Sequence, residues 1–216
     1  MSSISLATEM PDALLDEFGP LFEIGFALAH RVLEEDYYAD HFLRRQYQSV
    51  ILDNGFHELG HPVSVPELIE ASLRVQPSWV ICPDWLGEPK KTYEATKKFA
   101  EAMRKKSELD DTKIAVVLVG RDPNERRRYM ENTRRFADML CLPYREDRVS
   151  WFRENHIPFD RIHLLGMAEI DDVLLLEQCD AFLEHEWSID TSKPIKWGLM
   201  GKKISQIESL RRCPLK

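Results

Sequence analysis

The sequence lacks the long hydrophobic runs, paired cysteines and low-complexity tracts that mark several protein classes. No apolar run approaches the ~20 residues of a membrane-spanning helix. The first residues, MSSISLATEMPDALLDEF, show no basic segment followed by an apolar stretch, so we expect no secretory signal and a cytoplasmic location. The cysteines occur singly, which argues against a zinc knuckle or a disulfide scaffold; they are Cys82, Cys141, Cys179 and Cys213.

The composition is that of an acidic globular protein. The 216 residues are 44% hydrophobic and 31% charged, with a net charge of −8. At ~150 residues per domain, and without a Gly/Ser linker, this length predicts a single domain over 1–216. The segment from Lys193 onward carries seven basic residues and one acidic residue, a surplus of +6, which leaves about −14 for the remainder. Such a segment is either a solvated helix or a surface that faces a polyanion.

Short β-branched runs alternate with amphipathic stretches along the chain, which is typical of βα units around a parallel sheet. Seven runs are candidate strands: 22–29, 49–53, 79–84, 113–120, 138–144, 161–166 and 180–187. Helical spacing of apolar residues indicates helices within 65–75, 88–106 and 122–140. We predict an α/β fold of the TIM-like (β/α) barrel type, with an open doubly wound sheet as the alternative. The eighth strand lies in the first or last twenty residues, or is missing or irregular.

The segment from His57 to His61 reads HELGH and matches the HExxH pattern of zinc proteases. That pattern needs both histidines on one helical turn. Pro62 follows directly and favours extended backbone at His61, while 53–55 (Asp-Asn-Gly) is turn sequence. We therefore predict no metal site here and no cofactor, and keep a metal-dependent hydrolase only as an alternative.

Three aspartates close or follow predicted strands. Asp53 ends the second run, Asp84 ends the third, and Asp190 follows the last. In a parallel barrel the carboxyl ends of the strands meet at one opening, so these acids are expected around one substrate. Each of them taken singly is also a candidate helix N-cap.

Two motifs carry a family resemblance. The segment 52–58 (LDNGFHE) resembles the Asp-Ser-Gly-Gly-Phe-Gln segment of tRNA-guanine transglycosylases, and more closely the Asp-Asn-Gly form of their compact, phage-associated DNA-modifying relatives. The segments 163–168 (HLLGMA), 170–182 and 189–194 (IDTSKP) resemble that family's Met-Gly-Val-Gly strand, the helix after it and its Phe-Asp-Cys or Phe-Asp-Ser nucleophile strand. The resemblance extends over about residues 22–200.

The resemblance implies that the protein replaces guanine in a nucleic acid with a 7-deazaguanine base, such as 7-cyano-7-deazaguanine. Asp190 would then be the nucleophile that attacks C1′ and forms a covalent intermediate, and Asp53 the general acid and base. Two inverting displacements retain the configuration. Asp84 would bind the Watson–Crick edge of the base.

The same resemblance suggests further contacts to the base. Asn54 and Gly55 belong to the first motif, and the glycines Gly120 and Gly166 at strand ends would let a flat base approach the backbone. Aromatic side chains near the acids are candidates for stacking on the base or, alternatively, for core packing; they are Phe56, Trp85 and Trp187. His30 and His57 could line the opening or be structural.

The expected polymer is DNA rather than tRNA. The tRNA enzymes carry a cysteine-rich zinc site after the nucleophile strand, where this sequence has only Cys213, so we expect no zinc subdomain. Phosphate contacts are expected from Lys193, Lys196, Lys202 and Lys203, from Arg211 and Arg212, and from the arginines at 126–128, 134 and 135. Base exchange in tRNA, an N-glycosidase without exchange and a non-catalytic binding protein stay open as alternatives.

Overall fold

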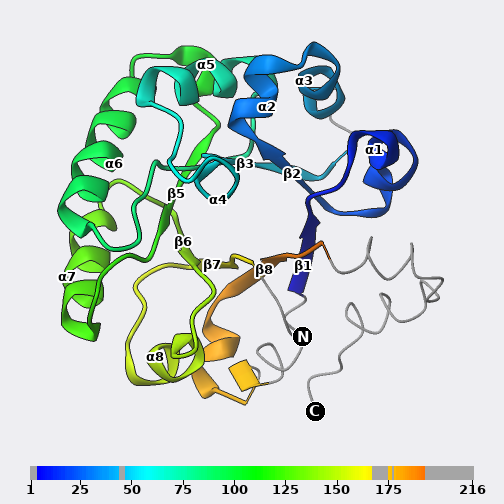
Figure 1. The fold of residues 1–216 in the computed structure, drawn as a ribbon. Helices are drawn as coiled ribbons and strands as arrows, with labels where there is room; N and C mark the ends of the chain where they lie inside the picture. The colour runs from blue at the N-terminus through cyan, green and yellow to red at the C-terminus, as the bar shows by residue number, and fades with distance from the viewer. Residues whose placement is uncertain (1–3, 44–46, 167–174, 177, 193–216) are drawn as a thin grey trace.

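The computed structural model is a closed barrel of eight parallel strands with helices around it (Figure 1). It describes residues 4–43, 47–166, 175–176 and 178–192. Each strand pairs in parallel with the next along the chain, and the last pairs with the first. The strands are β1 (Ile4–Thr8), β2 (Ile24–Leu28), β3 (Ser49–Asp53), β4 (Trp79–Ile81), β5 (Lys113–Val117), β6 (Met139–Leu142), β7 (Arg161–Leu164) and β8 (Glu186–Asp190).

Helices and short 3₁₀ turns connect the strands. The α-helices are α1 (Asp12–Phe18), α2 (Ala29–Glu34), α3 (Asp36–Leu43), α4 (Phe56–Leu59), α5 (Val65–Val75), α6 (Pro89–Met103), α7 (Pro123–Thr133) and α8 (Arg148–Glu154). The 3₁₀ helices are η1 (Gly19–Leu21), η2 (Ser107–Leu109) and η3 (Asp180–Glu184). Local sequence sets where the longer helices begin: Ser64 and Glu67 form a capping box on α5, and the Asp122 carboxylate accepts two backbone N–H bonds at the start of α7.

The barrel prediction is confirmed, and the open-sheet alternative is wrong because β8 closes on β1. The eighth strand, which the sequence did not locate, is β1, and it lies within the first twenty residues. The seventh predicted strand is displaced: residues 180–184 form η3, and the strand begins at Glu186. This shift makes Asp190 the last residue of β8 instead of a residue beyond it.

Strand alternation divides the core into two layers. Side chains such as Ile51, Ala115 and Met139 fill the barrel, and their strand neighbours, such as Leu52, pack outward against the helices. The interior layer ends at the carboxyl ends of the strands, where Asp53 and Asp190 continue the inward-facing positions of β3 and β8. The barrel thus has an apolar floor under an opening that carries acids.

Some sequence predictions fall outside the described residues. These are the basic segment from 193, with Lys193, Lys196, Lys202 and Lys203, and the arginines Arg211 and Arg212. Within the described ranges, no helix is both long and apolar enough to cross a membrane.

Candidate active site

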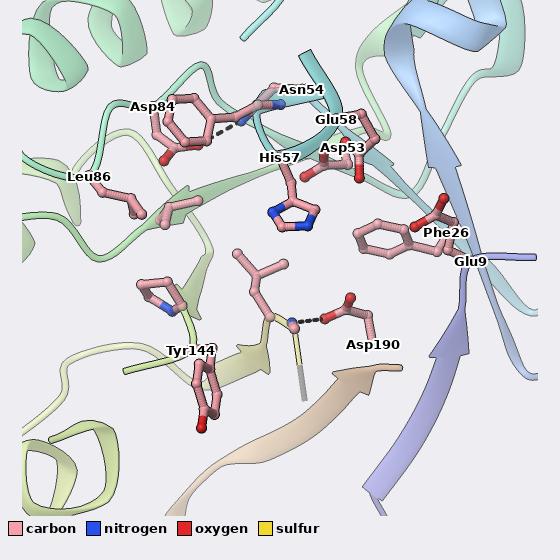
Figure 2. Close-up of a pocket in the computed structure, with 15 residues that line it drawn as sticks. Glu9, Phe26, Asp53, Asn54, His57, Glu58, Asp84, Leu86, Tyr144 and Asp190 are labelled. Atoms are coloured by element: carbon pink, nitrogen blue, oxygen red, sulfur yellow. Dashed lines mark hydrogen bonds between the residues drawn. The ribbon is translucent and has the colours of Figure 1, made fainter. Parts of the chain in front are cut away.

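A pocket of about 480 Å³ opens at the carboxyl ends of the strands and brings the three predicted acids together (Figure 2). Its volume is within the range of small-molecule sites. Five carboxylates face it, and none of the described residues that line it is a lysine or arginine. The lining residues are Glu9, Phe26, Asp53, Asn54, Phe56, His57, Glu58, Asp84, Leu86, Val117, Pro143, Tyr144, Leu165, Gly166 and Asp190. We call it the acidic pocket.

The Asp-Asn-Gly turn after β3 fixes two of the acids. The Gly55 N–H donates to Oδ2 of Asp53 at 2.8 Å, and Gly55 has the positive φ of 76° that favours glycine. The buried Asn54 amide donates from Nδ2 to Oδ1 of Asp84 and to the Cys82 carbonyl, both at 2.8 Å. Asn54 therefore ties the end of β3 to the loop after β4, and sets the position of Asp84 in the pocket.

Asp190 is held from the opposite side of the barrel. Its Oδ1 accepts the Gly166 N–H at 2.7 Å (Figure 2), and Gly166 has a positive φ of 61°. The Asp190 side chain is 17% exposed, and His163 Nε2 lies 3.7 Å from Oδ1 on the barrel side. The carboxylate thus has a fixed oxygen and one that is open to the pocket.

Burial raises the pKa of all three acids. The pKa of Asp53 rises to about 8, mainly through burial and further through the charges of Glu58, Asp84 and Asp190. The pKa of Asp190 rises to about 7 by burial, although the Gly166 N–H opposes this. The pKa of Asp84 rises to about 6, again by burial against the Asn54 hydrogen bond.

These pKa values separate the acids by protonation state. Between about pH 7 and pH 8, Asp53 keeps its proton while Asp190 and Asp84 are ionised. Two carboxyl groups with different pKa values can act as a general acid and a nucleophile in one site. The pocket can therefore combine proton donation with attack by a carboxylate.

The HELGH segment is divided between two pockets. Helix α4 ends at Leu59, and Gly60 then adopts a left-handed conformation with φ 73°. His57 and Glu58 line the acidic pocket, and Figure 2 shows the His57 ring directed into it. His61 lines a neighbouring pocket of about 850 Å³, which we call the second pocket. Among the described residues, no group of three or more His, Cys, Asp or Glu is arranged to hold a metal ion.

Several predicted site residues lie elsewhere. Trp187 faces the outer core, where its ring stacks on Phe182 at 4.7 Å, so its predicted role in base stacking is wrong. Trp85 and His30 line the second pocket instead, and Lys91 Nζ lies 4.0 Å from the centre of the Trp85 ring. Gly120 is outside the acidic pocket.

Three of the five arginines predicted as a phosphate-binding face on and just after α7 are engaged in structural contacts. Arg126 is buried and forms a salt bridge with Asp147 at 2.7 Å. Arg127 donates to the Asn155 side chain, and Arg135 donates to the Tyr93 hydroxyl. The prediction of a phosphate-binding face on this helix is therefore wrong for Arg126, which has no accessible guanidinium.

The structure adds residues that sequence reasoning missed. Glu9 follows β1, the strand that was not located, and Tyr144 and Leu86 lie on loops after β6 and β4. His163 was noted only as part of a motif, although its position two residues before the inward-facing Leu165 places it inside the barrel. Strand alternation counted from Asp190 would have identified Ser188 as inward-facing in the same way.

Comparisons with known proteins bear on the fold. No protein-family model and no curated protein sequence matches this chain. An enolase from Bradyrhizobium complexed with magnesium and mandelic acid aligns with a TM-score of 0.54 and 10% identity, over 88% of this chain and 52% of the enolase, so the chain spans about half the enolase's length. A phosphoribosyl anthranilate isomerase bound to a reduced carboxyphenylamino-deoxyribulose phosphate aligns with a TM-score of 0.48 and 12% identity, over 87% of this chain and 86% of the isomerase. At such identities the similarity to the enolase establishes the (β/α) barrel and nothing further.

Proposed function

We propose that the protein is a transglycosylase that exchanges guanine in DNA for a 7-deazaguanine base, such as 7-cyano-7-deazaguanine. One observation carries the proposal: Asp53 and Asp190, which the resemblance designates as acid/base and nucleophile, face the same pocket from β3 and β8. They are separated by more than 130 positions in the sequence and meet only because the barrel closes.

The raised pKa values of the two acids support this chemistry. In the first step, an Asp190 oxygen forms a bond to C1′ of the nucleotide while the C1′–N9 bond breaks, and the bond's electron pair leaves with guanine. Asp53, which is protonated below about pH 8, gives its proton to the departing base. In the second step, the incoming base returns a proton to Asp53 and attacks C1′, which releases Asp190 as a carboxylate.

The pocket suits an uncharged base rich in N–H groups. Asp84 is ionised above about pH 6, so it can accept hydrogen bonds from the Watson–Crick edge of a guanine-like base. Phe26, Phe56, Tyr144 and Leu86 supply apolar walls for a flat ring. Because five carboxylates and no lysine or arginine line the described pocket, the phosphates of the polymer must lie outside it.

DNA is the proposed polymer because Asn54 matches the Asp-Asn-Gly form of the DNA-modifying relatives. This residue also has a structural role here, since its amide holds Asp84. A base within a duplex must leave its stack to reach Asp190. Phosphate contacts are assigned to Lys193, Lys196, Lys202 and Lys203, which follow Asp190 closely in the sequence.

The test is incorporation of labelled base. Purified protein is incubated with single-stranded DNA, duplex DNA or tRNA, together with a radiolabelled 7-deazaguanine, and label in the polymer is counted. The wild type should label DNA, and Asp190→Asn should not. Asp111→Asn makes the same carboxylate-to-amide change at an exposed position and should retain activity.

The other outcomes separate the alternatives. Label in tRNA but not in DNA would show that tRNA is the substrate and would overturn the choice of DNA. Abasic sites without label would indicate an N-glycosidase. Stoichiometric zinc that is lost in His57→Ala would indicate a metal-dependent enzyme, and full incorporation by Asp190→Asn would refute the mechanism.

A further inference from the structure

A fully buried histidine lies on the barrel side of Asp190. His163 is in β7, its side chain is 0% exposed, and its ring stacks on Phe26 with 5.9 Å between ring centres. The barrel interior also contains apolar side chains such as Ile51 and Met139. A polar ring in such surroundings loses its hydration, which is unfavourable unless the ring forms hydrogen bonds. The position therefore requires a chemical explanation.

The neighbouring strand supplies one hydrogen bond. The parallel register pairs His163 with Ser188 of β8, and their Nδ1 and Oγ atoms lie 2.8 Å apart. Burial lowers the pKa of His163 to about 3, so the ring is neutral and only one nitrogen carries a proton. When the Ser188 hydroxyl donates to Nδ1, the proton must be on Nε2.

The Nε2 atom faces Asp190. It lies 3.7 Å from Oδ1 and forms no hydrogen bond in the described part of the chain. Oδ1 is also the oxygen that accepts the Gly166 N–H (Figure 2). Two N–H groups from the β7 side are therefore available to one oxygen, and the other oxygen is left for the pocket.

We propose that His163, with Nδ1 accepting the Ser188 hydroxyl and its proton on Nε2, is a positioning residue that donates its Nε2–H to Oδ1 of Asp190 and so leaves Oδ2 as the attacking oxygen. This inference rests on the proposed function, in which Asp190 bonds to C1′. The 3.7 Å separation is longer than a hydrogen bond. At 3.7 Å the Nε2–H dipole already favours the Asp190 carboxylate in the free protein, and such contacts commonly shorten when substrate binds. His163 keeps its proton throughout, because the departing base takes its proton from Asp53.

Other charges also act on Asp190. Burial raises its pKa and Glu9 adds to this effect, whereas the Gly166 N–H, the backbone N–H of Asp190 itself and Arg148 lower it. The titratable or charged groups around it from the packed elements are Glu9, Asp53, Cys141, Arg148 and His163. Loss of the His163 donor leaves Oδ1 with the Gly166 N–H, so the Asp190 carboxyl should hold its proton to higher pH.

Three variants test the role. His163→Leu fills the space without a hydrogen-bond donor, and His163→Gln restores an N–H near the Nε2 position. Ser188→Ala removes the hydroxyl that contacts Nδ1 and so no longer favours the tautomer with a proton on Nε2. For each variant, kcat and KM for base exchange in DNA are measured. The Asp190 carboxyl is also titrated by ¹³C NMR in the free protein, with its resonance assigned by Asp190→Asn.

The expected result for His163→Leu is a fall in kcat of about 10- to 100-fold, as for loss of a hydrogen bond to a charged group. KM should change by less than about threefold, because the contact forms to the nucleophile and not to the base. The Asp190 titration in the free protein should move to higher pH, because the carboxylate loses the Nε2–H dipole. His163→Gln should recover most of both effects, and Ser188→Ala should show both in weaker form.

Unchanged kcat and unchanged titration in His163→Leu would overturn the inference. If His163→Leu does not fold, the same two measurements on Ser188→Ala test the inference, because removing a single hydroxyl disturbs the fold less. The NMR titration needs no DNA, so it separates the two proposals. If His163→Leu shifts the Asp190 titration but the wild type exchanges no base, the proposed function is refuted and the His163 contact is supported. If the wild type exchanges base but His163→Leu leaves the Asp190 titration unchanged, the His163 contact is refuted and the proposed function is supported.

Discussion

Replacing Asp53 with asparagine should stabilise the protein at alkaline pH while it abolishes turnover. Asparagine has nearly the shape of a protonated aspartate and keeps an oxygen that can accept the Gly55 N–H. The folded state raises the pKa of Asp53 from 3.8 to about 8. Each pKa unit corresponds to ~1.36 kcal/mol, so the full shift amounts to about 6 kcal/mol.

The direction of the effect follows from proton binding. Because the folded state holds this proton more tightly than the unfolded chain, the stabilisation is fully present below about pH 4 and is lost as the pH rises to about 8. The wild type loses this stabilisation as the pH rises, whereas Asp53→Asn does not, because asparagine does not ionise. We therefore expect the two proteins to differ by under about 0.5 kcal/mol at pH 4 and by up to about 6 kcal/mol at pH 8.5, with the variant more stable.

Urea unfolding at both pH values, followed by tryptophan fluorescence and circular dichroism, measures this difference. Asp111→Asn is the matched control at an exposed position and should stay within about 0.5 kcal/mol of the wild type at either pH. A variant that is less stable than the wild type at pH 8.5 would refute the reasoning. So would a difference of the same size at pH 4, since it could not come from ionisation.

Three further outcomes are expected. The rate of base exchange should follow a bell-shaped pH profile with limbs near pH 7 and pH 8, because Asp190 must be ionised and Asp53 protonated; a flat profile from pH 5 to pH 9 would contradict this. Asn54→Ala should raise KM for the incoming base about tenfold with kcat within about threefold, in steady-state assays, because Asp84 loses the amide that holds it. Gly120→Ala should lower the free energy of unfolding by about 1–3 kcal/mol, since the added Cβ would lie 2.7 Å from the Arg126 backbone nitrogen at a φ of +145°. Gly87→Ala, which meets nothing within 4 Å, is its control and should unfold like the wild type in urea.

The sequence predicts the barrel because βα alternation needs only local patterns. The run at 65–75 coincides with α5, since its capping box and apolar spacing are local signals. Strand β1 was not located because five residues with a weak alternation give little signal before their neighbours are known. The displaced seventh run shows the opposite error: residues 180–184 are apolar enough for a strand but form η3.

The acids of the site could be predicted because parallel topology brings strand ends together. The aromatic side chains could not be assigned by proximity in sequence. Trp187 lies three residues before Asp190, and an odd separation on a strand places two side chains on opposite faces. Trp187 is accordingly in the outer core and Asp190 in the pocket. His163 and Ser188 form a pair only through the register of β7 with β8, which no local pattern encodes.

The most direct test of the central claim is to trap the covalent intermediate. DNA is mixed with the protein without incoming base, quenched in denaturant, and the adduct is digested and sequenced by mass spectrometry. The proposed mechanism predicts a nucleotide attached to the peptide that contains Asp190, with the adduct absent in Asp190→Asn and present in Asp111→Asn. An adduct that persists in Asp190→Asn, or base exchange by the wild type with no adduct at any quench time, would contradict it.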